Sequence, residues 1–220
     1  MLSLSRLQKP ILASFPAALF LALALSLGSS PSVAEQNQGT DAIAPVEEFS
    51  KQVEEFKKSY PDLNKKIEES ARSIDAITDV EQAQKEIEEL RAAVSGMLGA
   101  VADNGPVSEL GAKALAHARA KIRDLEQGNR FTQDERDFLL DQWRKLATET
   151  ERATDELNGA REEFAELLRL LQTREDFVQE LLEIRRATEA LNVMRKLTQD
   201  IRDASNKLKS LIGGIKAPGA

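Results

Sequence analysis

The chain has 220 residues, contains no Cys and carries a formal net charge of −7 at pH 7. This acidity argues against a nucleic-acid-binding protein, which would present a basic surface. Without Cys the chain can form neither a disulfide nor a thiolate metal site, so its folded state must rest on packed apolar faces.

Residues 1–34 have the pattern of a targeting segment. Two basic residues precede an apolar run from Ile11 to Leu27, and small residues follow up to Ala34. This order is typical of a secretory signal peptide that is cleaved after Ala34. The run is shorter than the roughly 20 apolar residues of a spanning helix, and an uncleaved inner-membrane anchor is the alternative.

The expected mature chain, residues 35–220, has features of a periplasmic protein. It lacks Cys, and none of its Asn residues lies in an Asn-X-Ser/Thr acceptor sequence. Such a chain fits a bacterial periplasm better than a eukaryotic secretory route. We therefore predict export to the periplasm.

Amphipathic helices are predicted for the first half of the mature chain. Residues 35–45 are polar and aperiodic, and a flexible leader is expected there. Residues 46–127 place apolar residues three and four apart, which predicts helical segments. Pro61 is expected to end or kink the first helix. The capping box at residues 78–81 marks either a new helix or an internal turn.

A heptad pattern organises the second half, after a clear capping box formed by Thr132 and Glu135. From Leu139 to Leu181 the spacing alternates between four and three residues. This spacing predicts a helix that buries one stripe against a partner helix, in the same chain or in another copy. We call this stripe the heptad seam: Leu139, Trp143, Leu146, Thr150, Ala153, Leu157, Ala160, Phe164, Leu167, Leu171, Arg174, Val178 and Leu181. Interaction is expected through its larger apolar members: Leu139, Trp143, Leu146, Leu157, Phe164, Leu167, Leu171, Val178 and Leu181.

The pattern favours one long coiled-coil helix over residues 132–212. The heptad phase passes unbroken through Asn158-Gly159, so a turn is not expected there. At about 1.5 Å per residue this helix would be a rod of about 120 Å. The alternative is a bend near residues 172–187, where Arg174 lies on the seam and the apolar positions slip, giving an antiparallel bundle. Residues 213–220 are expected to form a flexible tail.

No stretch alternates with the period of two that strands require. The expected fold class is therefore all-α: an elongated helical coiled coil or antiparallel helical bundle, preceded by a cleaved signal peptide.

Candidate chemical residues are few. The only His, His117, lies between Lys113 and Lys121 at helical spacing, and two cations there oppose metal binding. Carboxylates such as Glu162, Glu163 and Glu166 are expected to form a solvated helix face. General acid–base chemistry would need two carboxylates in a cleft with separated pKa values. We predict no enzyme, no cofactor and no metal.

Two seam residues have alternative interpretations. Trp143 is predicted as a core residue, or else as an anchor for another protein. Arg174 is predicted to pair with an acidic residue of a facing helix, or to fix the register of the coiled coil.

The last helical segment is basic, which suggests a contact surface. Its members define what we call the basic segment: Arg185, Arg186, Arg195, Lys196, Arg202, Lys207 and Lys209. One interpretation is weak contact with an anionic envelope surface. The other is internal neutralisation by an acidic helix of the same bundle.

The resulting hypothesis is a non-enzymatic, exported coiled-coil protein that acts through protein–protein contacts, as a scaffold, an adaptor or a secretion or envelope component. Its partners are not identified by the sequence, and a homo-oligomer through the heptad seam is one option. A periplasmic holdase-type chaperone is one alternative. A helical metal-sensing or ligand-binding module is the other.

Overall fold

The computed structural model describes residues 43–76, 79–128, 130–183 and 185–219, and it contains helices and no strand within them. The helices are α3 (Ala44–Ala76), α4 (Val80–Val101), α5 (Pro106–Gln127), α6 (Gln133–Glu183) and α7 (Ala187–Gly214). The all-α helical bundle predicted from the periodicity is therefore confirmed. The expected signal peptide and most of the expected leader lie outside the described residues.

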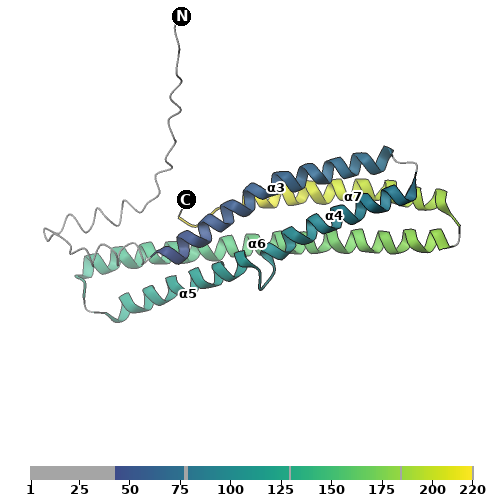
Figure 1. Cartoon of the computed structure of the whole chain (residues 1–220). Helices are drawn as coiled ribbons and strands as arrows, with labels where there is room; N and C mark the ends of the chain where they lie inside the picture. Colours follow the sequence, from purple (N-terminus) through teal and green to yellow (C-terminus); the bar gives the residue numbers. More distant parts are fainter. Residues whose placement is uncertain (1–42, 77–78, 129, 184, 220) are drawn as a thin grey trace, which may run out of the picture.

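The 51-residue helix α6 is the axis of an elongated antiparallel bundle (Figure 1). Helices α4 and α5 follow one another along one side of α6, and α7 returns along its C-terminal half. Helix α3 packs against α4, α5 and α7. Four helices (α3, α4, α6 and α7) thus surround the core at one half of the molecule, whereas the other half is built on α5 and α6, with the start of α3 packed on α5.

Three aromatic side chains, two from α3 and one from α6, form the centre of the core. The ring of Phe164 is fully buried and meets the rings of Phe56 and Tyr60 edge-on, at centroid distances of 6.4 and 6.5 Å. The Tyr60 hydroxyl donates to the Ser205 carbonyl of α7 at 2.9 Å, which satisfies its polar atom inside the core. Burial raises the pKa of Tyr60.

Capping side chains set the starts of α4 and α6. The carboxylate of Asp79 accepts from the Glu81 backbone N–H at 3.0 Å, so a new helix begins here with Asp79 as its N-cap. At α6, Glu135 accepts from the Thr132 N–H at 2.9 Å, and Thr132 Oγ1 accepts from the Glu135 N–H at 3.4 Å. The capping box predicted at α6 is confirmed. The Thr132 N–H and the Thr132 hydroxyl, which donates at 2.8 Å, both donate to the Glu135 carboxylate and lower its pKa.

Pro61 was expected to end or kink the first helix, and the first of these alternatives is wrong. Helix α3 continues through Pro61 to Ala76. Its inner face is buried on both sides of the proline, with Tyr60 and Leu63 each no more than 6% exposed. Tertiary packing of this face outweighs the loss of one backbone hydrogen bond.

The prediction of a single helix over residues 132–212 is also wrong, because the chain reverses between Glu183 and Ala187. The reversal falls late in the interval 172–187 given for the alternative bend, and α6 passes through Arg174 without a break. The N–H of Arg185 donates to the Leu182 carbonyl at 2.9 Å, and that of Arg186 to the Leu181 carbonyl at 2.8 Å. These bonds form a Schellman motif, which ends a helix.

Folding α7 back gives its own apolar stripe a partner, which a straight rod would not. The stripe is buried against α6 and α3. Its members are Ala190, Met194, Leu197, Ile201, Leu208 and Ile212.

The predicted flexible tail at residues 213–220 is instead packed, as far as it is described. Helix α7 includes both Gly213 and Gly214, and Ile215 is 1% exposed. Beyond the helix, the N–H of Lys216 donates to a carboxylate oxygen of Glu156 at 3.2 Å. Similarly, the N–H of Gly219 donates to Glu149 at 2.9 Å. Carboxylates of α6 therefore hold the backbone of this segment.

Candidate interaction surfaces

The larger part of the heptad seam forms the core of the chain itself. From Leu157 to Leu181 its apolar members are 0–7% exposed. They face α4, α5 and α7, the helices that pack against α6. A homo-oligomer through this part of the seam would have little apolar surface to use, since the same chain already covers it.

The first turns of α6 differ from the predicted seam. Leu140 and Ala147 are buried, each 8% exposed, whereas the predicted members Leu139 and Leu146 are only partly buried. The buried stripe is therefore displaced by one residue relative to the strict heptad. The buried face of a straight helix drifts by about 20° per heptad relative to an exact 3.5-residue repeat. The first turns of α6 pack on α5, without α4 and α7, which keep the stripe in place farther along α6.

Trp143 lies in a small apolar cluster separate from the main core. Its ring is 4% exposed, and its centroid lies 5.7 Å from the ring of His117 on α5. It packs with Ala118 and Ala147, and the partly buried Ile43 joins the cluster. Trp143 and His117 thus connect α5 to α6. No group of three or more His, Asp or Glu side chains within the described residues is arranged to hold a metal ion.

Ion pairs between helices account for part of the basic segment. Arg202 pairs with Asp75 of α3 at 2.6 Å, and Lys207 pairs with Glu163 of α6 at 2.5 Å. Arg186 pairs locally with Glu189 at 2.9 Å. Internal neutralisation thus occurs at these positions. The remaining members lie on the exposed surface: Arg185, Arg195, Lys196 and Lys209.

Asp75 joins α3 to α7 through two hydrogen bonds. Its carboxylate accepts from the Thr198 hydroxyl at 2.7 Å and from the Arg202 guanidinium at 2.6 Å. Burial of the carboxyl group raises its pKa, but these two hydrogen bonds outweigh that effect and the pKa of Asp75 is lowered.

Arg174 also links two helices. Its guanidinium lies 3.2 Å from the Asp200 carboxylate of α7, as expected for pairing with a facing helix. On the neighbouring face of α6, Glu166 pairs with Arg169 at 2.7 Å. Glu163 pairs with Lys207, so both carboxylates have a basic partner. Such pairing is typical of a solvated, charged helix face.

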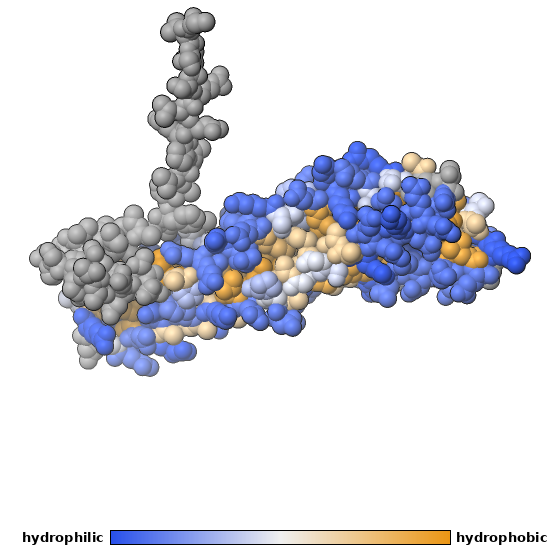
Figure 2. All heavy atoms as spheres, viewed as in Figure 1, coloured by the Kyte–Doolittle hydropathy of each residue, from blue (hydrophilic) through white to orange (hydrophobic). Residues whose placement is uncertain are grey.

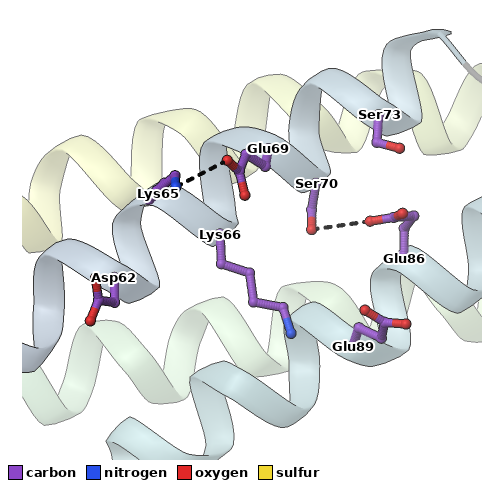
Figure 3. Close-up of a pocket in the computed structure, with 8 residues that line it drawn as sticks. All are labelled: Asp62, Lys65, Lys66, Glu69, Ser70, Ser73, Glu86 and Glu89. Atoms are coloured by element: carbon purple, nitrogen blue, oxygen red, sulfur yellow. Dashed lines mark hydrogen bonds and ion pairs between the residues drawn. The ribbon is translucent and has the colours of Figure 1, made fainter.

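A shallow hollow between α3 and α4 is lined by charged and hydroxyl side chains of both signs (Figure 3). The Ser70 hydroxyl donates to Glu86 at 3.3 Å, and Lys65 lies 3.7 Å from Glu69. The Lys66 side chain extends from α3 toward the α4 side of the hollow. Because its charged side chains are of both signs, the hollow offers no single-sign site for a ligand.

Among the residues that the structure describes, three Phe side chains are exposed, and sequence reasoning missed all of them. Phe131, Phe138 and Phe177 are 44%, 39% and 45% exposed. On the face shown in Figure 2 the coloured surface is mostly hydrophilic, with apolar strips along the body. Their position off the heptad seam could have indicated their exposure. An amphipathic helix normally keeps aromatic residues on its apolar stripe.

None of the described helices is long and apolar enough to cross a bilayer. The chain matches no protein family model, no curated protein and no solved structure.

Proposed function

We propose that this chain is an exported, non-enzymatic helical protein that works by binding other proteins, as a scaffold, an adaptor or an envelope component. The proposal combines an N-terminal segment typical of secretory signals with a bundle whose charged groups pair with one another. In this proposal α6 is the rigid spacer between two contact regions.

The observation that carries the proposal is the placement of the exposed Phe side chains. Phe131 lies just before α6, Phe138 lies near its start, and Phe177 lies near its other end. Large aromatic side chains that are already exposed are typical anchors of protein interfaces. Along α6 between these two regions, the large apolar residues of the seam from Leu157 to Leu171 are buried.

The test is site-specific photo-cross-linking in cells. A photoreactive residue replaces Phe138, Phe177 or, as control, Asn206, an exposed polar residue of α7. We expect discrete cross-linked protein products at Phe138 or Phe177 and none at Asn206. Equal cross-linking at all three positions, or at none, would contradict the proposal.

Export is tested separately by the mass of the protein recovered from cells. Cleavage after Ala34 predicts a chain that begins at Glu35 and fractionates with the periplasm. A chain that retains residues 1–34 and sediments with membranes would favour the anchored alternative.

A holdase is the second candidate, and one feature favours it. Around the Trp143 cluster, the side chains of Leu115, Ile122 and Leu125 on α5 are only partly buried. An apolar surface of this kind could hold an unfolded segment. Suppression of the aggregation of an unfolded outer-membrane protein, lost on Phe138→Ser, would favour this candidate over a scaffold.

A further inference from the structure

Residues 215–219, which we call the end segment, leave the helix but stay on α6. Helix α7 ends at Gly214. Near that end, Lys207 of α7 pairs with Glu163 of α6, and the end segment binds carboxylates that lie closer to the start of α6. It therefore continues the antiparallel course of α7 along α6 as a non-helical stretch (Figure 1).

Two carboxylates of α6 bind the backbone of the end segment. The N–H of Lys216 donates to Glu156 at 3.2 Å, and the N–H of Gly219 donates to Glu149 at 2.9 Å. The two carboxylates lie two turns apart on one face of α6 and are partly exposed. A Cβ at Gly219 would lie 3.7 Å from the partly buried Leu146. We call the face formed by Leu146, Glu149 and Glu156 the motif site.

Burial restricts the side chains of the end segment. Ile215 and Ala217 are 1% and 5% exposed and belong to the main core, and Pro218 is buried as well. Gly219 has a φ of 74°, a conformation that favours glycine, whereas the Lys216 side chain is exposed. The bound sequence is therefore a short motif: an aliphatic anchor, an exposed basic residue, a small residue, Pro and Gly.

Few contacts hold the end segment in place. Its one large apolar side chain is Ile215, whose N–H donates to the Ile212 carbonyl at 3.3 Å. Gly213 and Gly214 join it to the rest of α7, and a Cβ at either position would meet open space. Segments with few buried apolar contacts open at a lower free energy than the whole fold. The end segment can therefore leave the motif site while the bundle stays folded.

We infer that the motif site binds an extended segment of a partner protein, and that the end segment fills this site as an internal competitor. The partner segment has the chemistry of the present occupant, with free backbone N–H groups before and after its small residue and Pro. The carboxylates of the site also favour a basic residue in that segment. Binding of the partner then requires displacement of the end segment, so local opening regulates the contact.

This inference goes beyond the proposed function, because the motif site lies on α6 between Phe138 and Phe177 and contains neither of them. The two share only the assumption of a protein partner. Photo-cross-linking through the two Phe positions does not depend on the end segment, so each proposal can fail while the other stands.

The probe is a synthetic peptide of residues 213–220, added to the chain from Glu35 to Ala220. In the natural chain the tethered end segment has an effective concentration of about a millimolar or more, so it competes with the free peptide. Ile215→Asp frees the site, because an unpaired carboxylate is costly to bury. We expect the peptide to bind this variant at least about tenfold more tightly than the natural chain. Titration followed by NMR at the Glu149 and Glu156 amides measures both affinities.

A neighbouring substitution is the matched control. Lys216→Gln keeps the backbone N–H and changes only an exposed side chain, so it should bind the peptide as weakly as the natural chain. Circular dichroism melting checks that Ile215→Asp folds. Gly219→Val strains the left-handed backbone without changing Ile215, and it provides a second opened variant. Equal affinities of the natural chain and the opened variants, or no binding at about a millimolar peptide, would overturn the inference.

Two further changes test the assigned contacts in the Ile215→Asp chain. Glu156→Gln should weaken peptide binding by about threefold or more, because a neutral acceptor forms a weaker hydrogen bond. Glu162→Gln, at an exposed carboxylate of the same helix, should leave the affinity unchanged. A peptide carrying Gly219→Ala should bind about tenfold more weakly, since an L residue disfavours the left-handed conformation. Equal losses for the two α6 variants, or equal binding of the two peptides, would overturn the assigned site.

Discussion

The four-helix half of the molecule and the end formed by residues 115–127 of α5 and residues 131–146, here called the open end, use the same helix, α6, in different ways. In the four-helix half, α4 and α7 both contact α6, and seam residues such as Leu167 and Leu171 are 0–1% exposed. At the open end, Leu139 and Leu146 keep the heptad spacing but are only partly buried. The heptad therefore selects the positions that can be buried, and the number of neighbouring helices decides which of them are.

The charged residues show the same contrast. In the four-helix half, ion pairs such as Arg91–Glu175 at 2.6 Å and Arg202–Asp75 connect different pairs of helices. At the open end, the cross-helix pair Arg144–Glu126, at 2.9 Å, joins only α5 to α6. Exposed pairs contribute little stability individually, so the open end depends mainly on the Trp143 cluster.

The largest expected effect is a loss of core packing in the four-helix half. Phe164→Ala should lower the free energy of unfolding by about 3–5 kcal/mol, because it leaves a cavity beside Phe56 and Tyr60. At the open end, Leu125→Ala should cost less than about 2 kcal/mol, since that side chain is only partly buried. Urea denaturation followed by circular dichroism measures both, and equal losses would contradict the comparison.

Two glycines between these regions, one on α5 and one on α6, should give changes of opposite sign when replaced by Ala. A Cβ at Gly111 would lie 3.1 Å from the fully buried Phe49 ring and 3.2 Å from Thr154, where α3, α5 and α6 meet. Gly111→Ala should therefore cost about 1–3 kcal/mol. A Cβ at Gly159 would meet no other group within 4 Å. Gly159→Ala should therefore stabilise α6 by up to about 1 kcal/mol. Thermal melts that shift both variants in one direction would refute the packing at Gly111.

The turn that closes the four-helix half carries a strained residue. Arg185 has a φ of 60°, the left-handed conformation that glycine adopts most readily at the end of a helix. Arg185→Gly should therefore raise the free energy of unfolding by about 1 kcal/mol. Arg186, with a φ of −102° and an ion pair to Glu189, is the control, and Arg186→Gly should give no gain. A gain for the control as large as that for Arg185→Gly would argue against backbone strain as the cause.

The smallest expected effect concerns pH and the link between α3 and α7. The pKa of Asp75 is lowered in the folded state, so its contribution is present above the unfolded pKa of about 4 and is lost as the pH falls through the folded pKa. Because its side chain is 41% exposed, the contribution should be below about 1 kcal/mol. Asp75→Asn should be less stable than the natural chain at pH 7, and the difference should shrink toward pH 2. A difference that grows on acidification would contradict the assigned direction.

Local signals in the sequence predicted the helices well, but they predicted poorly where the chain reverses and which side chains stay exposed. The capping box at Thr132 and Glu135 and the unbroken helix through Gly159 follow from hydrogen bonding and periodicity within a few residues. The reversal at Arg185 was placed in the less favoured alternative, because a left-handed Arg is not a recognisable stop signal. The exposed Phe131 and Phe138 were missed because they lie off the heptad seam, and the heptad spacing predicts only which positions can be buried.

The sequence by itself determined that the chain is helical, acidic, free of disulfides and organised by a stripe that must be covered. Those properties depend on composition and on spacing of three and four residues, which are local. Only the tertiary structure decided that the stripe is covered by the same chain, that α7 folds back on α6, and that the start of α6 has too few neighbours. These outcomes depend on contacts between residues far apart in the chain, such as Tyr60 with Ser205, which no local pattern records.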